Sequence, residues 1–443
     1  MTFFSKETTA LNRTNLRKLA LEILHSGIER VLPENEMYNN ISVSDGSISV
    51  FGEKHSFSGN LYVIGSGKAA AIMAGTFEDI AGVQKIREGY VNAPRSFPLK
   101  KIIVNEASIP IPNERGYRGA KKICEIAKNA KKGDIVVCLI SGGGSVLMPH
   151  PVDGVSLLEK QQMTKLLFEA GVPTYSIQHV RKHVSKMKGG RLAKLIQPAK
   201  VIGLMVSDVV NPADVCAAGP TMPDDSTYDD AYDVLTKYGL LEDVPDSIIS
   251  HIVRGKNRHE EETPDSQELF WSNVYNYDIV NNKMALDAMA GKARSFGFET
   301  LILPPVIGST EFVTRMFARK IRDVRKRAKK YAIIASSEMA VALRGNGRGG
   351  RNQELAARLI GELSSDRTSV FASLDSDGQD YIKGIGGAII DNQTARKAIF
   401  ENISPGSFLD KSDSYYIHDK LGTLIRMEST GTNVGDIHIY LQE

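Results

Sequence analysis

The sequence predicts an α/β protein with an N-terminal doubly wound, Rossmann-like parallel sheet and a C-terminal α/β domain that has a mixed sheet. Its 443 residues exceed what one hydrophobic core usually organises, which indicates two domains. From residue 61 onward, short apolar runs alternate with helical stretches, as in βαβ units that bury a parallel sheet. A polar stretch without apolar period separates the halves. We therefore expect domains at residues 1–255 and 272–443, joined by a solvated linker at 256–271.

Composition and charge narrow the class of protein. The 42% hydrophobic and 24% charged residues are those of an ordinary globular chain, and a net charge of +3 gives no reason to expect a nucleic-acid partner. Cys124, Cys138 and Cys216 are odd in number and lack C-x-x-C spacing, which indicates neither disulfides nor zinc. There is no secretory pattern and no apolar run of membrane length. We expect a cytoplasmic monomer or homodimer that binds small molecules and not membranes.

The N-terminal region begins with an amphipathic helix and leads to the first strand. Apolar residues recur at helical spacing from Leu16 to Val31 and stop before Pro33, which predicts a packing helix. The first apolar run of the sheet, residues 61–66, then leads into a glycine turn and a helix start rich in small residues. In parallel sheets, ligands bind beyond the carboxyl ends of the strands, so such turns are where functional residues are expected.

The first glycine turn is Gly65-Ser66-Gly67-Lys68, which matches the G-x-G-x-x-A dinucleotide fingerprint. Glycines at this place let a phosphate approach backbone N–H groups at a helix N-terminus. The next predicted strand ends at Asn92 without the acid that a dehydrogenase uses to hold ribose. Lys68 within the turn favours phosphoryl transfer. The alternative is that the glycines only permit a tight turn.

The second turn, Ser141-Gly142-Gly143-Gly144-Ser145, directly follows the apolar run that ends at Ile140. Three consecutive glycines are costly in backbone entropy, and a nest of N–H groups around an oxyanion would account for them. A flexible loop is the alternative. Downstream, Ser156 and Glu159 form a capping-box pattern, which predicts the start of a helix that ends at Gly171.

A third region combines a predicted helix at 176–193 with a strand from residue 200. His179 and His183 are four residues apart and share a helical face; we interpret them as structural or anion-facing side chains, with a metal site as the alternative. Asp208 stands where the strand ends. A carboxylate there can hold Mg²⁺ or accept the proton of a substrate hydroxyl. The alternative is that Asp208 only caps the N-terminus of a helix.

The C-terminal half carries further helices and strands and three polar glycine motifs. We expect a helix at 283–296, a strand at 299–303 and a basic but solvated helix at 310–330. The motifs are "RGNGRGGRNQEL" at 344–355, "DSDGQD" at 375–380 and "STGTNVGD" at 429–436. Arginines on glycine-rich backbone suit a phosphate or carboxylate clamp. Each motif alone is compatible with turn chemistry; together they predict a polar face toward a cleft between the domains.

These motifs, in this order, resemble the two-domain glycerate 2-kinases whose C-terminal half is called the MOFRL domain. The resemblance covers most of the chain, from the N-terminal helix through "GSGKAA", "SGGGS", "HVRKHVSKMKGGRLA", "SDVVNPADVCAAGPT", "GGRNQELA" and "DSDGQD" to "TGTNVGD". It implies transfer of the γ-phosphoryl group of ATP to D-glycerate, usually giving 2-phosphoglycerate, in the cleft between domains, with ATP and Mg²⁺ as cofactors.

The resemblance also assigns residues. The family's lysine after the first glycine turn falls on Lys68 and its strand-end aspartate on Asp208; we expect both to be catalytic, with Asp208 as the candidate metal ligand. The residues expected to bind substrate or phosphate are Gly65, Ser66, Gly67, Ser141, Gly142, Gly143, Gly144, Ser145, Arg181, Asn211, Arg351, Asn352, Gln353 and Asp377.

The chain departs from the family pattern at three places. Residues 108–113 read Ser-Ile-Pro-Ile-Pro-Asn where Gly-His-Pro-x-Pro-Asp is common, Tyr381 replaces a glycine, and residues 427–429 replace Thr-Gly-Pro. Two other functions stay open. One is an NAD(P)H-dependent hydroxypyruvate reductase that would use the Gly65 turn for the pyrophosphate, and the other is a non-catalytic regulator that binds nucleotides or sugar acids.

Overall fold

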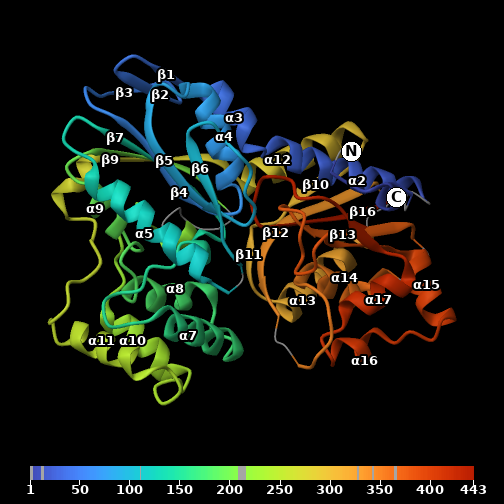
Figure 1. Cartoon of the computed structure of the whole chain (residues 1–443). Helices are drawn as coiled ribbons and strands as arrows, with labels where there is room; N and C mark the ends of the chain where they lie inside the picture. Colours follow the sequence, from blue (N-terminus) through green and yellow to red (C-terminus); the bar gives the residue numbers. More distant parts are fainter. Residues whose placement is uncertain are drawn as a thin grey trace. The chain divides into compact units, whose positions relative to one another are not determined.

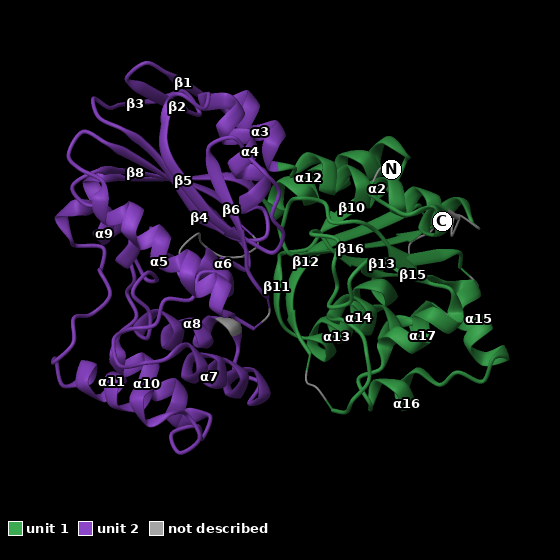
Figure 2. Cartoon of the chain, viewed as in Figure 1, with its two compact units in different colours: residues 1–32, 281–443 green, residues 33–280 purple. Residues whose placement is uncertain are grey.

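The computed structural model describes residues 3–10, 14–109, 111–207, 216–326, 329–341, 344–363 and 367–443. The chain divides into two compact units, one formed by Pro33–Val280 and the other by Met1–Leu32 together with Asn281–Glu443 (Figure 2). Below, they are called the central unit and the terminal unit. This division differs from the expected boundaries at both ends of the first domain, because the N-terminal helix packs with the C-terminal half.

The central unit contains a six-stranded sheet in the order β6-β5-β4-β7-β8-β9, which is the strand order of a doubly wound, Rossmann-like sheet. The neighbouring pairs from β6 to β8 are parallel, so the predicted fold class is confirmed for this half. Its strands are β4 (Leu61–Ser66), β5 (Ile86–Ala93), β6 (Ile102–Glu106), β7 (Ile135–Ser141), β8 (Lys200–Ser207) and β9 (Val274–Asn281). The strand order reverses between β4 and β7, the switch point where ligands bind in such sheets.

Helices make the crossovers of this sheet and a separate helical layer. The crossovers include α4 (Ala70–Ala81) and α5 (Glu114–Asn129), and α5 packs on the sheet together with α9 (Arg191–Ile196). The second layer has its own core around Tyr228 and is built from α7 (Leu157–Glu169), α8 (Thr174–His183), α10 (Tyr228–Lys237) and α11 (Asp246–Lys256) (Figure 1). The remaining elements are α3 (Pro33–Asn40), the three-stranded antiparallel sheet β1–β3 (Ile41–Ser44, Ser47–Val50 and Glu53–Ser56) and α6 (Gly144–Leu147).

One expectation for the central unit is wrong, and another holds only in part. The helix predicted at 176–193 is two helices, α8 and α9, because Gly189 and Gly190 adopt positive φ of 53° and 75° and donate to carbonyls of residues 218 and 219. The stretch at 256–271, expected to be a solvated linker or exposed loop, belongs to the central unit and is mostly exposed, although Thr263 and Pro264 are buried. Thr263 is only 4% exposed, and Asp224 N–H donates to Pro264 O at 2.9 Å.

The terminal unit is built on a seven-stranded mixed sheet, as predicted. Its order is β10-β12-β16-β13-β14-β15, with β11 also paired to β12. β10 and β11 are parallel to β12, and the other pairs are antiparallel. The strands are β10 (Glu299–Ile302), β11 (Val306–Ser309), β12 (Tyr331–Ala340), β13 (Ser369–Asp375), β14 (Ile385–Asp391), β15 (Leu424–Arg426) and β16 (Asp436–Gln442).

Helices cover both faces of this mixed sheet (Figure 1). On one face, the apolar stripe of α2 (Asn15–Arg30) packs against α12 (Asn282–Ser295) so closely that a Cβ on Gly27 would lie 2.7 Å from Met289 Cγ. On the other face lie α13 (Thr310–Arg325), α14 (Arg351–Leu359) and α17 (Ser414–Leu421), which enclose an apolar core. Short α1 (Lys6–Ala10), α15 (Asn392–Phe400) and α16 (Pro405–Leu409) complete the unit. No helix among the described residues is both long enough and apolar enough to span a bilayer.

Candidate active site

The two glycine turns of the central unit meet at the switch point of its sheet. Lys68 N–H donates to Gly142 O at 2.9 Å, which ties the turn after β4 to the turn after β7. A Cβ on Gly65 would lie 2.2 Å from Leu139 O, and one on Gly67 would lie 2.0 Å from Ser141 Oγ. Neither position has room for a side chain. The close approach of the two turns is therefore enough to require these glycines.

The backbone amides of the Gly65 turn are occupied by acceptors of the protein itself. Gly67 N–H donates to Asn92 O at 3.1 Å, and Ala69 N–H donates to Ser141 Oγ at 3.0 Å. With the Lys68 amide on Gly142 O, the donors that a dinucleotide pyrophosphate would use are already bound. What distinguishes this turn is the side chain of Lys68. Its stem lies over Gly143, since a Cβ there would be 3.2 Å from Lys68 Cγ.

The triple-glycine turn leads into the short helix α6. Gly143 has a left-handed φ of 80° and precedes the first residue of α6. Gly144 contacts the β4 turn, because a Cβ on it would lie 2.7 Å from Ser66 O, and Ser66 Oγ donates to Gly144 O at 3.4 Å. Ser145 is buried, and its hydroxyl has no hydrogen-bond partner in the described part of the chain. A buried hydroxyl without a partner is unusual and marks a position that a ligand could satisfy.

One residue of the stretch that departs from the family pattern, Ile109, reaches the triple-glycine turn. Ile109 approaches Gly143, whose Cβ would lie 2.8 Å from Ile109 Cδ1. The Asn113 side chain caps α5 by accepting a hydrogen bond from Gly116 N–H at 2.9 Å. An aspartate at this N-cap would accept the same bond. The departures from the family pattern therefore place an apolar side chain beside the Lys68 stem.

Strand β8 ends at Ser207, at the same edge of the sheet as Ser141, since β7 and β8 are parallel neighbours. The predicted catalytic and metal residue Asp208 and the predicted binding residue Asn211 lie outside the described residues. Their roles stay predictions.

Three buried cations lie in the helical part of the central unit. Lys160, Arg181 and Lys188 are 3%, 7% and 0% exposed. Burial, together with the charge of Arg181, lowers the pKa of Lys160 to about 7. Burial lowers the pKa of Arg181 to about 10, and burial with the charges of Lys160 and Arg181 lowers that of Lys188 well below its usual range.

Only Arg181 of these three was among the predicted site residues. The signal for Lys160 is its spacing: it stands three, four and seven residues before Met163, Thr164 and Leu167, all buried on α7. A lysine in the apolar stripe of a helix is a candidate for function. Lys188 lies where the chain breaks between α8 and α9, and its burial follows from that break.

The two histidines of α8 have structural contacts. His183 is fully buried, with Nδ1 2.7 Å from His179 O and Nε2 3.1 Å from Glu262. His179 packs its ring edge-on against Tyr175. Across the described ranges, no three His, Cys, Asp or Glu side chains gather into a group that could hold a metal ion.

In the terminal unit, the predicted clamp residues are engaged with carboxylates of the chain. Arg351 donates from Nε to Asp436 at 2.6 Å and from Nη2 to Asp375 at 2.7 Å. Although burial alone would lower it, Asp436 and Asp375 hold the pKa of Arg351 well above its ordinary value. Burial raises the pKa of Asp436 to about 7 despite the opposing charge of Arg351.

The neighbours of Arg351 extend the same network. Asn352 donates to Asp436 at 2.6 Å, and Gln353 binds Asp380 through its backbone N–H at 2.9 Å and its side chain at 3.0 Å. These three residues open helix α14 and are not on a flexible loop, contrary to the expected clamp. Asp377 belongs to the adjoining turn, where it accepts from Gln379 N–H at 2.7 Å. We call this group the Arg351 network.

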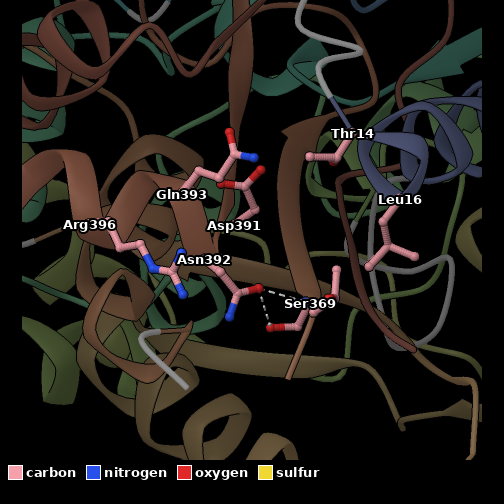
Figure 3. Close-up of a pocket in the computed structure, with 8 residues that line it drawn as sticks. Thr14, Leu16, Ser369, Asp391, Asn392, Gln393 and Arg396 are labelled. Carbon is pink, nitrogen blue, oxygen red and sulfur yellow. Dashed lines mark hydrogen bonds between the residues drawn. The ribbon is translucent and has the colours of Figure 1, made fainter. Parts of the chain in front are cut away.

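The terminal unit also has a small polar pocket (Figure 3). It is lined by Thr14, Leu16, Thr368, Ser369, Asp391, Asn392, Gln393 and Arg396. Asp391 caps α15 and pairs with Arg17 at 2.6 Å, and Asn392 Oδ1 accepts from Ser369 N–H at 2.7 Å. These side chains serve the architecture of the unit.

Comparison with known proteins gives matches over nearly the whole chain. Residues 19–253 match a domain of unknown function, DUF4147, and residues 331–436 match the MOFRL family. The glycerate 2-kinase of Pyrococcus horikoshii is 35% identical, over 96% of this chain and 97% of that protein. The crystal structure of glycerate kinase from Thermotoga maritima superposes with a TM-score of 0.77 at 32% identity, covering 97% of this chain and 100% of that one. A putative hydroxypyruvate reductase of Agrobacterium vitis is 32% identical over 86% of this chain and 99% of that protein.

Proposed function

The chain belongs to the glycerate kinase family, and on that premise we propose that it transfers the γ-phosphoryl group of ATP to D-glycerate, giving 2-phosphoglycerate. The observation that carries the proposal is the position of Lys68. It leaves a turn whose own amides are occupied, at the switch point of the sheet, with its stem over the triple-glycine turn. A cation placed there suits charge neutralisation on a phosphoryl group in transfer.

In phosphoryl transfer the protein mainly positions the reactants and neutralises their charge, because the loose transition state needs little covalent catalysis. We assign to Lys68 the offset of negative charge on the moving group. Arg181, Ser145 and the turn from Ser141 to Gly144 supply donors for the anionic substrate groups. Gly65, Ser66 and Gly67 act by holding the β4 turn against the β7 turn. Asp208 is assigned to orient the attacking hydroxyl, with Asn211 beside it.

In the terminal unit, Arg351, Asn352, Gln353 and Asp377 are proposed to contribute through the Arg351 network. That network is rigid, since the three side chains that open α14 are all bound to buried carboxylates. The network contains one cation, Arg351, and several carboxylates. We therefore assign it the ordering of polar ligand groups and not the capture of a free phosphate.

Mg²⁺ is proposed to enter with ATP, and Asp208 is its candidate protein ligand. Magnesium in kinases is commonly held by one or two carboxylates, water and the substrate phosphates, and this agrees with the lack of a metal-binding group of three among the described side chains. When bound, the ion would neutralise phosphate charge. The three cysteines are free and buried, which suits a reducing compartment and supports a cytoplasmic enzyme.

The test is direct. Purified protein is incubated with ATP, Mg²⁺ and D-glycerate, ADP is followed in a coupled assay, and the phosphorus NMR spectrum identifies the product. Glycerate-dependent ADP formation with 2-phosphoglycerate supports the proposal. A 3-phospho product would correct the position of transfer, and ADP formation that ignores glycerate would contradict the proposed reaction.

The second candidate is a hydroxypyruvate reductase, which the name of one relative favours. The occupied amides of the Gly65 turn and the missing acid after Asn92 speak against a nicotinamide dinucleotide at this place. An absorbance assay with NADH or NADPH and hydroxypyruvate separates the two reactions. A non-catalytic regulator would show ligand-dependent stabilisation without turnover in either assay.

A further inference from the structure

The central unit buries more positive charge than its described residues balance. Lys160 comes from α7, Arg181 from α8 and Lys188 from the segment between α8 and α9. Each is at least nine-tenths buried. Within the described ranges, no carboxylate forms an ion pair with any of the three. Burying a charge is costly unless a counter-charge and hydrogen bonds offset the lost hydration, so this arrangement needs an explanation.

Helix capping explains only part of it. Lys160 Nζ donates to Val184 O at 3.2 Å and Lys188 Nζ donates to Met148 O at 3.0 Å, and these carbonyls close α8 and α6. A neutral carbonyl satisfies one of the three donors of an ammonium group and none of its charge. Arg181 lies 5.2 Å from the Phe168 ring, and its Nη2 has no hydrogen-bond partner in the described part of the chain.

Lys182, next to Arg181 on α8, is a buried cation that does have a carboxylate partner. Lys182 is also buried, and its Nζ lies 2.9 Å from Asp224 Oδ1. The fold can thus supply a carboxylate to a buried lysine of α8. At the adjacent position, Arg181, it supplies an aromatic ring instead.

The cluster lies close to the triple-glycine turn. Met148, the acceptor of Lys188, ends the helix that begins at Gly144, and a helix of that length rises by about one turn, roughly 5 Å. Ser145, whose hydroxyl is buried without a partner, is in the first turn of the same helix. Lys188 therefore contacts the end of the short helix that carries Ser145, and Lys160 and Arg181 are close enough to Lys188 for their charges to act on it.

We propose that Lys160, Arg181 and Lys188, with the Ser145 hydroxyl, form a buried oxyanion site that takes the carboxylate or a phosphoryl group of the substrate. The choice of ligand rests on the proposed function, whereas the chemistry of the site rests on these contacts. A fork-shaped guanidinium and two ammonium groups can donate to all oxygens of such a group.

Binding at this site should take up protons. Because burial lowers the pKa of Lys160 to about 7, most of this amine is neutral near pH 8 in the free protein; burial also lowers the pKa of Lys188 well below its usual range. Other titratable groups coupled to them do not change charge there, since burial raises the pKa of Cys124 to about 12 and lowers that of His150 to about 4. Lys182 and Lys186 are paired with Asp224 and Asp153. An incoming anion favours the charged amines and so draws protons from the buffer.

The experiment measures anion binding by calorimetry and by thermal shift, with inorganic phosphate and with D-glycerate as probes. The variants are Lys160→Met, Lys188→Met and Arg181→Lys, and Lys165→Met, an exposed lysine of α7, is the control. We expect each cluster variant to weaken binding of at least one probe tenfold or more and the control to change it less than twofold. The probe affected more strongly identifies the group bound. Cluster variants that bind both probes like the wild type would overturn the proposal.

A second measurement serves if a variant does not fold. Binding enthalpies of the wild type at pH 8 are compared in buffers of different ionisation enthalpy. A net uptake of protons supports the oxyanion site, and a slope of zero contradicts it. The outcomes are separable from the proposed function: absent kinase activity with cluster-dependent anion binding refutes only the function, and normal activity with cluster-independent binding refutes only the site.

Discussion

The oxyanion cluster of the central unit and the Arg351 network of the terminal unit both place cations beside glycine-rich turns, but the charges of these cations are balanced in opposite ways. Arg351 is held by two carboxylates at 2.6 and 2.7 Å, and they raise its pKa. Among the residues that the structure describes, Lys160 and Lys188 have carbonyl acceptors and no carboxylate partner, and burial lowers their pKa values. A satisfied network fixes the architecture of its unit, whereas an unbalanced cluster stores an affinity for anions at the expense of stability.

The largest effect that would sharpen this contrast concerns Lys68, the cation that we assign to the phosphoryl group in transfer. Replacing it with Met should lower kcat by about a thousandfold, ~4 kcal/mol, because an electrostatic contact to the transition state is lost. The coupled ADP assay measures this. Lys54→Met, an exposed change on β3, is the matched control. Full activity of the Lys68 variant with an unchanged melting temperature would remove the central residue of the mechanism.

The next effect tests the unbalanced cluster through pH. The pKa of Lys160 is about 7 in the folded protein and about 10.5 in an unfolded chain, so the unfolded state binds more protons between these values. Wild-type stability should therefore rise as pH increases from about 7 toward 10.5. Lys160→Met removes this dependence, so the stability of the variant relative to the wild type should be about 4 kcal/mol more favourable at pH 6 than at pH 10.

Urea denaturation at pH 6, 8 and 10 measures this difference, with Lys165→Met as the control. Because the methionine also leaves Val184 O without its donor, the absolute stability can fall. The pH-dependent difference is the informative quantity. Parallel stability profiles for the variant and the wild type would show that Lys160 stays charged throughout.

Removal of the cation from the Arg351 network should lower the stability of the protein, and by more at high pH than at low pH. Arg351→Met leaves Asp375 and Asp436 buried without their counter-charge, and we expect a loss of about 2 kcal/mol, at the low end for a buried pair because about a third of the arginine side chain reaches the surface. A raised carboxyl pKa favours the protonated folded state, so the loss should be smaller at pH 5 than at pH 8. Denaturation midpoints at the two pH values test this, with Arg348→Met as the control.

The smallest expected effect concerns the hydroxyl that joins the two glycine turns. Ser141→Ala removes the acceptor of Ala69 N–H and should cost about 1 kcal/mol of stability. We expect kcat to stay within threefold, since the Ser141 hydroxyl holds the turn, whereas the backbone amides of the turn are the donors that we assign to the substrate. A loss of activity comparable to that of the Lys68 variant, with normal stability, would instead make Ser141 a ligand contact.

Much of the fold was predictable because its signals are local. The apolar runs gave β4, β7 and β8, the helical period gave α2, and Ser156 with Glu159 forms the predicted capping box. The break between α8 and α9 was missed, since two adjacent glycines inside a helical pattern show their positive φ only when carbonyls of residues 218 and 219 are in place. The burial of Thr263 and Pro264 was missed because the stretch around them is polar and mostly exposed, as is typical of a linker or loop.

The candidate site was predictable only in part for a similar reason. Lys68 and the triple glycine stand at strand ends, which sequence reasoning can locate. The burial of Lys160 and Lys188 depends on contacts between α6, α7 and α8 that no local pattern specifies. The partners of Arg351 could not be foreseen either, because Asp375 and Asp436 come together only through the pairing of β13 with β16.

The pairing of α2 with α12 has a consequence for synthesis of the chain. The ribosome makes the helix at Asn15–Arg30 first, yet its packing partner at Asn282–Ser295 emerges only after the whole central unit has been translated. Until then the side chains of Leu21, Leu24 and Ile28, all fully buried in the finished protein, lack their partners on the nascent chain. The terminal unit must therefore close last, and the early helix is the segment for which a chaperone would be most useful during elongation.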